Sequence, residues 1–242
     1  MKTLFLIFMG MGALLSCSKT ISPVPADTVV DAPANTTTMP VSANTISYLA
    51  LGDSYTIGQS VDQKEAFPYQ LSAKLAGKGL QNPTIIAQTG WTADNLIAAI
   101  NSSGISSNKY DMVTLLIGVN DQYQGLSQTN YRAKFVQLVN TAITFAKGNK
   151  TRVFVVSIPD YGVTPFANGA EATIGPLIDQ FNAINKEESD KAGVNYINIT
   201  PISKGAATDK SLIAIDGLHP SAGMYALWVN AITPVVIKQL MP

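Results

Sequence analysis

The sequence predicts an α/β fold, a three-layer α/β/α sandwich with a central parallel sheet of about five strands. Two observations predict it. Short apolar runs bounded by turn residues recur along the chain from residue 46 onward. Between them lie longer segments whose apolar residues have helical spacing. Continuous apolar runs are typical of strands covered on both faces, and strands that alternate with helices form the βαβ units of a parallel sheet.

The runs expected to be strands are rich in Val, Ile, Leu or Tyr and lack the polar alternation of a half-exposed strand. Because each run is short and apolar throughout, it suits a strand buried between two layers of helices. These runs are residues 46–51, 83–88, 112–117, 152–158 and 196–199.

Four of the segments between or after these runs are expected to be helices. In the first, Phe67, Leu71 and Leu75 follow each other at intervals of four and lie on one helix face. Gly193 is placed to cap the carboxyl end of the third, and Ser221 to cap the amino end of the last. The expected helices fall within residues 67–75, 131–148, 177–193 and 221–240.

The first 16 residues have the pattern of a signal peptide. Lys2 precedes an apolar run over 3–15, which is shorter than the roughly 20 residues that a membrane-spanning helix needs. The run ends in Ser16-Cys17, which resembles the lipoprotein signal of bacteria. The resemblance implies cleavage after Ser16 and lipid attachment at Cys17. An ordinary secretory signal followed by an incidental cysteine is the alternative.

Residues 17–45 are expected to be a lipidated, disordered tether rich in Pro, Thr and Ala. The segment has no apolar periodicity, so it cannot bury enough apolar surface to offset the entropy of ordering it. The predicted organisation is therefore a signal peptide (1–16), a tether (17–45) and one folded domain (46–242). The expected location is the bacterial cell envelope, as a lipid-anchored periplasmic or outer-membrane protein, with secretion as the alternative.

The composition excludes several function classes. Sixteen Lys and Arg balance sixteen Asp and Glu, so the chain lacks the basic surface that nucleic-acid binding needs. One cysteine and one histidine exclude a disulfide framework and nearly every Cys/His zinc site. An enzyme of this sequence that uses histidine as an acid or base must use His219.

Ligands of open parallel sheets bind beyond the carboxyl ends of the strands. Three predicted strands are followed there by Gly52-Asp53-Ser54, Gly90 and Asn120-Asp121, and Asp216-Gly217-Leu218-His219-Pro220 stands near the carboxyl terminus. Each segment alone has a structural interpretation, because serine, asparagine and aspartate also cap helices and glycine also makes turns.

Together and in this order, the four segments resemble the four sequence blocks of the SGNH hydrolases, also called GDSL-type esterases and lipases. The resemblance covers residues 46–242. It implies the flavodoxin-like SGNH hydrolase fold and a hydrolase that acts on ester bonds.

The residue types fit that chemistry. Ser54 is the expected nucleophile that forms an acyl-enzyme, and His219 is the base that activates it and then the acid for the leaving alcohol. Asp216 is expected to accept the other ring N–H of His219. The resemblance implies an oxyanion hole made of the backbone N–H groups of Ser54 and Gly90 and the side-chain amide of Asn120. No metal or organic cofactor is needed.

Three neighbouring residues have expected supporting roles. Asp53 and Asp121 are interpreted as structural, each holding a loop by hydrogen bonds to backbone amides. Gly90 is expected to let its N–H approach the oxyanion closely, because glycine has no Cβ in the way.

The sequence indicates the reaction more narrowly than it indicates the substrate. A small-molecule, lipid or acylated-glycan ester fits the resemblance. Five side chains are candidates for a substrate pocket, although aromatic residues there could equally pack loops onto the sheet; they are Trp91, Gln122, Tyr123, Tyr161 and Phe166. Two other functions stay open: an O-acyltransferase that moves acetyl groups between envelope glycans with the same triad, and a non-catalytic glycan-binding lipoprotein.

Overall fold

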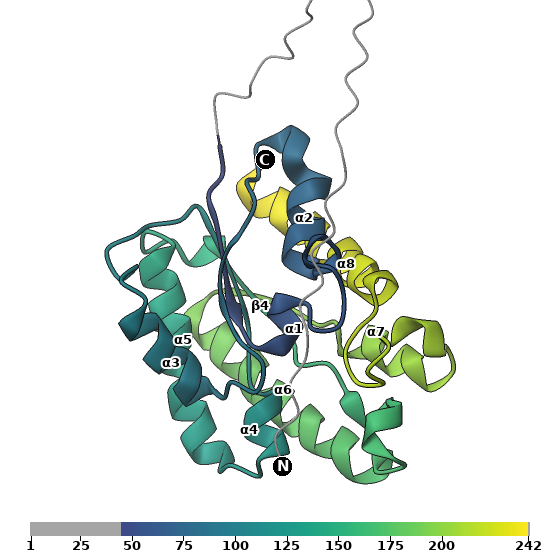
Figure 1. Cartoon of the computed structure of the whole chain (residues 1–242). Coiled ribbons are helices and arrows are strands. Elements are labelled where there is room, and N and C mark those ends of the chain that lie inside the picture. The colour runs from purple at the N-terminus through teal and green to yellow at the C-terminus, as the bar shows by residue number, and fades with distance from the viewer. Residues whose placement is uncertain (1–44, 242) are drawn as a thin grey trace, which may run out of the picture. The chain divides into compact units, whose positions relative to one another are not determined.

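The computed structural model describes residues 45–241 (Figure 1). The predicted signal peptide, Cys17 and residues 17–44 of the predicted tether lie outside the described residues. Within residues 45–241, no helix is both long and apolar enough to cross a bilayer.

The described residues contain a five-stranded sheet in which all neighbouring strands are parallel. The strand order is β2-β1-β3-β4-β5, the flavodoxin-like order. Each strand overlaps one of the predicted runs, with ends that differ by up to two residues. The strands are β1 (Tyr48–Gly52), β2 (Thr84–Ala87), β3 (Met112–Leu116), β4 (Val153–Val156) and β5 (Asn195–Ile197).

Helices cover both faces of the sheet and complete the predicted three layers (Figure 1). Helices α2 and α8 pack against each other, as do α5 and α6, while α3 packs on α5. The helix bounds are α1 (Ser54–Ile57), α2 (Phe67–Leu75), α3 (Ala93–Ser102), α4 (Val119–Tyr123), α5 (Gln128–Phe145), α6 (Glu171–Ala192), α7 (Thr200–Lys204) and α8 (Ala222–Leu240).

The four predicted helices correspond to α2, α5, α6 and α8, and the predicted caps are present. Gly193 ends α6 in the left-handed conformation with φ 76°, which glycine adopts without steric cost. The Ser221 side chain accepts a hydrogen bond from the Met224 N–H at the start of α8. Helix α6 begins at Glu171, ahead of Leu177, and α1, α3, α4 and α7 have no counterpart among the predicted helices.

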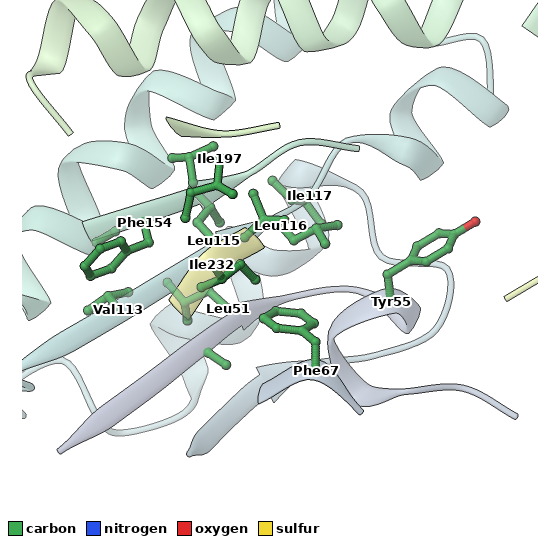
Figure 2. Packing of buried hydrophobic residues seen from close by; sticks show 14 of the residues in the cluster. Leu51, Tyr55, Phe67, Val113, Leu115, Leu116, Ile117, Phe154, Ile197 and Ile232 are labelled. Atoms are coloured by element: carbon green, nitrogen blue, oxygen red, sulfur yellow. The ribbon is translucent and has the colours of Figure 1, made fainter. Parts of the chain in front are cut away.

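The core lies on both faces of the central strands. All residues of β1, β3 and β4 are buried. Figure 2 shows Leu51, Val113 and Phe154 from these strands beside Phe67 of α2 and Ile232 of α8. Since burying such a side chain contributes on the order of 1.5–3 kcal/mol, this packing holds β1 and β3 in place. These two strands lie next to each other where the strand order reverses, the usual position for a ligand.

Candidate active site

Ser54 is held at the end of β1 by a tight turn. It is the first residue of α1, which is capped by Asp53, whose Oδ1 accepts the Tyr55 N–H at 3.0 Å. The backbone around Gly52, the last residue of β1, leaves no room for a side chain. A Cβ at Gly52 would lie 2.1 Å from Thr56 Oγ1 and 2.5 Å from the Leu116 carbonyl oxygen. The sequence Gly-Asp-Ser therefore lets the chain turn directly from a buried strand into the helix that carries Ser54.

Asp216 and His219 lie on one loop before α8 and bond to each other. Asp216 Oδ2 lies 2.6 Å from His219 Nδ1, and Asp216 Oδ1 accepts the backbone N–H groups of Leu218 and His219, each at 2.9 Å. The spacing of three residues thus places the carboxylate against the ring. The His219 side chain is only 6% exposed, whereas that of Asp216 is 27% exposed.

The electrostatics of Asp216 favour its ionised form. Partial burial acts to raise the pKa of this carboxyl. Hydrogen bonds from Ser60, from the His219 ring and from two backbone N–H groups outweigh that effect and hold the pKa well below its ordinary value. The aspartate is therefore a charged acceptor for the histidine ring throughout the neutral range.

Packing joins the Ser54 helix to the His219 loop. The Tyr55 ring lies against the His219 ring with centroids 5.1 Å apart. Tyr225 of α8 donates its hydroxyl to the Tyr55 carbonyl at 3.0 Å, and both tyrosines are buried. Movement of α1 relative to His219 would disrupt this aromatic contact.

Helix α4, which carries Asn120, is hydrogen-bonded to the loop after β2 that carries Gly90. The Asn120 side-chain amide donates to the Trp91 carbonyl at 3.0 Å, and Asp121 Oδ2 accepts the Ala93 N–H at 3.0 Å. Asp121 and Asp53 therefore bond to backbone amides, as predicted. Gly90 has φ 80° and nothing within 4 Å of a Cβ at this position. Glycine is favoured at position 90 by its backbone conformation and not by contacts with other residues of the chain.

A cavity of about 130 Å³ brings the predicted residues together. Four of the predicted active-site residues line it together with aromatic and apolar side chains. Asp216 is not part of the lining and is bonded to His219, which is. Its lining is Ser54, Tyr55, Thr89, Gly90, Val119, Asn120, Tyr123, Tyr161, Phe166, Leu218 and His219.

Three of the five predicted pocket side chains line this cavity and two do not. Tyr123, Tyr161 and Phe166 line it and contact one another, with ring centroids 6.0–6.5 Å apart. Trp91 instead packs against the hydrophobic core, and Gln122 is 8% exposed. Sequence reasoning missed Tyr55, Thr89, Val119 and Leu218, which are neighbours of the block residues and could have been found by that adjacency.

The two supporting aspartates are buried. Burial raises the pKa of Asp53 to about 8, and the Tyr55 N–H only partly offsets this. Burial likewise raises the pKa of Asp121 to about 6. In the part of the chain that the structure describes, no group of three or more His, Cys, Asp or Glu side chains could hold a metal ion.

Asp53 is expected to make stability depend on pH. Its folded pKa of about 8 exceeds the ordinary 3.8, so the folded state binds the extra proton between these values. The stability that this proton supplies is complete below the unfolded pKa and is lost as pH rises through the folded one. From pH 5 to 7, the free energy of unfolding should fall by roughly 1.4 kcal/mol per pH unit relative to Asp53→Asn.

Urea unfolding at pH 5, 6 and 7 measures this difference. Only the slopes are compared, because Asp53→Asn puts an amide nitrogen in place of one carboxylate oxygen, and Asp53 Oδ2 has no hydrogen-bond partner among the described residues. Asp209→Asn, at an exposed aspartate, is the control and should keep the wild-type slope. Parallel slopes for wild type and Asp53→Asn would contradict the prediction.

Comparison with known proteins relates this geometry to a family. Residues 50–227 match the model of the GDSL-like Lipase/Acylhydrolase family. A search of curated proteins found no match.

Solved structures share the fold. A lipase/acylhydrolase from Enterococcus faecalis is 18% identical with a TM-score of 0.64, covering 82% of this chain and 98% of its own. EstA, a psychrotrophic esterase from Pseudoalteromonas sp., is 17% identical (TM-score 0.61, coverage 81% and 99%). Axe2, an acetylxylan esterase from Geobacillus stearothermophilus, is also 17% identical (TM-score 0.60, coverage 81% and 94%). With the family model matching most of its length, this chain belongs to the GDSL-like lipase/acylhydrolase (SGNH hydrolase) family and is a hydrolase that acts on ester bonds.

Proposed function

We propose that the protein is a serine esterase that hydrolyses carboxylic esters through a triad of Ser54, His219 and Asp216. The observation that carries the proposal is the 2.6 Å contact between His219 Nδ1 and the Asp216 carboxylate. With Nδ1 donating to Asp216, Nε2 is the nitrogen left to accept the proton of the Ser54 hydroxyl. Ser54 and His219 line the same cavity, which supports this assignment.

The first half of the reaction forms the acyl-enzyme. Ser54 Oγ attacks the ester carbonyl carbon while its proton passes to His219 Nε2, and the carbonyl oxygen becomes an oxyanion. The backbone N–H groups of Ser54 and Gly90 and the Asn120 amide donate to that oxyanion. Asn120 Nδ2 has two hydrogens, so one remains available when the other bonds to the Trp91 carbonyl.

Collapse of the tetrahedral intermediate completes the acyl-enzyme, because it breaks the bond to the alcohol oxygen, which takes its proton from His219. The second half releases the acid. A water molecule then attacks the acyl carbon and gives a proton to His219, and Ser54 leaves with that proton. Asp216 stays ionised throughout and stabilises the imidazolium that forms in each half.

The size of the cavity favours esters with a short acyl chain. Its volume of about 130 Å³ lies well below the roughly 300–1,000 Å³ of pockets that enclose drug-sized ligands. Tyr123 and Phe166 remain exposed at its edge, where the alcohol part of a substrate could lie.

A panel of 4-nitrophenyl esters from acetate to dodecanoate, together with acetylated xylan and lysophospholipid, tests this function. We expect kcat/KM to be highest for acyl chains of two to four carbons and hydrolysis to need no added metal. Highest activity on the longest chains or on lysophospholipid would overturn the short-chain preference. Transfer of acetyl groups to added sugars in preference to water would instead identify an acyltransferase, and no turnover with any ester would contradict an esterase.

We also propose that the enzyme is lipid-anchored in the bacterial cell envelope through Cys17. The proposal is supported by Lys2, the apolar run over 3–15 and the Ser16-Cys17 pair in the sequence. Labelled palmitate should be incorporated by the wild-type protein in bacterial cells and not by Cys17→Ala. Equal labelling of both would contradict the anchor at Cys17.

A further inference from the structure

Ser60 links the helix that carries Ser54 to the loop that carries Asp216. The Ser60 hydroxyl donates to Asp216 Oδ2 at 2.7 Å, although 156 positions separate the two residues in the sequence. The same carboxylate oxygen lies 2.6 Å from His219 Nδ1. One oxygen of Asp216 therefore accepts from the histidine ring and from a residue just beyond α1.

The backbone of Ser60 indicates that its hydroxyl has a use. Ser60 has φ 68°, in the left-handed region that few residues other than glycine adopt readily. Glycine at this position would avoid the cost of that conformation but would lack the hydroxyl. A non-glycine residue held in this region is a reason to look for a functional constraint.

The neighbouring residue makes a second link to the active site. Thr89, which precedes Gly90, donates its hydroxyl to the Gln59 side-chain oxygen. The turn after α1 is thus bonded on one side to the Gly90 loop and on the other to Asp216. It is placed to fix the distance between the Ser54 helix and both loops.

We propose that Ser60 is a positioning residue of this esterase, whose hydroxyl keeps the Asp216 carboxylate oriented toward His219. The inference rests on the proposed triad. A carboxylate that accepts from two donors at one oxygen loses rotational freedom, and hydrogen bonds to a charged group are stronger than those between neutral groups. Ser60 would act through Asp216 and need not touch the substrate.

The groups that surround the Asp216 carboxylate agree with this role. Burial acts to raise the pKa of Asp216, and hydrogen bonds from the Ser60 hydroxyl, the His219 ring and two backbone N–H groups lower it. The other titratable groups facing Asp216 are His219 on its own loop, Tyr55 of α1 and Tyr225 of α8. Burial raises the pKa of both tyrosines far above its ordinary value, so they stay neutral where the enzyme would be assayed.

Two variants distinguish the effect of the Ser60 hydroxyl from the effect of its backbone conformation. Ser60→Ala removes the hydroxyl and keeps the strained conformation, whereas Ser60→Gly removes the hydroxyl and relieves the strain. We expect kcat to fall about five- to tenfold in both with KM unchanged, since water can replace part of the hydrogen bond at this exposed site. We also expect the acid limb of the kcat/KM profile to move to higher pH, because the Asp216 carboxylate stabilises the imidazolium more strongly when it has one donor fewer.

Ser211→Ala is the matched control, because its hydroxyl also donates to an exposed aspartate, Asp209, at 2.6 Å. It should leave kcat and the pH profile at wild-type values. Wild-type kcat and acid limb in both Ser60 variants, with Ser54→Ala inactive, would overturn the Ser60 inference and leave the triad standing. A slow Ser60→Ala beside a wild-type Ser60→Gly would also overturn it, because the backbone and not the hydroxyl would then matter. Full activity of Ser54→Ala would instead overturn the proposed function.

Discussion

Ser54→Ala is expected to lower kcat for ester hydrolysis by roughly 10⁴–10⁶-fold, the loss that removal of a serine nucleophile causes in other triads. The variant retains the oxyanion donors and the cavity, so KM should change little. Alanine keeps the Cβ of Ser54, and α1 keeps its Asp53 cap, so the fold should be retained. His219→Ala should lose activity to a similar degree, because the serine hydroxyl is a weak nucleophile without its base.

Two measurements check these losses. Steady-state hydrolysis of 4-nitrophenyl acetate gives kcat and KM, and intact mass after treatment with a fluorophosphonate shows whether Ser54 becomes phosphonylated. Wild type should gain one phosphonyl group, Ser54→Ala none, and His219→Ala should react far more slowly.

Ser189→Ala is the matched control for Ser54→Ala. Ser189 is a buried serine of α6 whose hydroxyl has no partner among the described residues, and it does not line the cavity. Its activity and labelling should be those of wild type. Retention of wild-type activity by Ser54→Ala would contradict the mechanism, as would labelling of that variant.

The parts of the fold that sequence predicted best are those set by burial. Strands β1, β3 and β4 are buried along their whole length, so their apolar runs stand out without any knowledge of what covers them. Helix α3 has two signals that the prediction did not use: Thr92 and Asn95 form a capping box at its start, and the buried Leu96 and Ile100 lie four positions apart. Helix α6 contains Pro176, a residue that usually ends a helical pattern, so the predicted helix begins at Leu177 and omits the six residues before it.

Some residues of the site could likewise be predicted from the sequence, and others could not. Ser54, Asn120 and His219 follow strands or precede a helix within short motifs, so their grouping could be expected from the topology of a parallel sheet. Ser60 has no such signal, since its bond to Asp216 depends on the left-handed turn after α1 and joins distant parts of the chain. Trp91 and Gln122 show the opposite difficulty, because residues beside a motif can point into the protein instead of the cavity.

Asn120→Ala is expected to lower kcat by roughly 10²–10³-fold with little change in KM, the usual cost of removing one side-chain donor from an oxyanion hole. The Asn120 amide bonds to the Trp91 carbonyl at 3.0 Å, which aligns its remaining N–H before substrate binds. A donor aligned in advance stabilises the charge of the transition state more than the neutral ester, so the loss should fall on kcat. Asn120→Asp keeps the shape but replaces the donor with a carboxylate that repels the oxyanion, and should lose more activity than alanine.

Steady-state kinetics of both variants beside Asn230→Ala, at an exposed asparagine of α8, measure the effect. The Asn230→Ala control should have wild-type kcat and KM. Phosphonylation of Ser54 should still occur in Asn120→Ala, though more slowly, because the nucleophile and its base are intact. A wild-type kcat for Asn120→Ala would remove Asn120 from the oxyanion hole and leave stabilisation of the charge to the backbone N–H groups of Ser54 and Gly90.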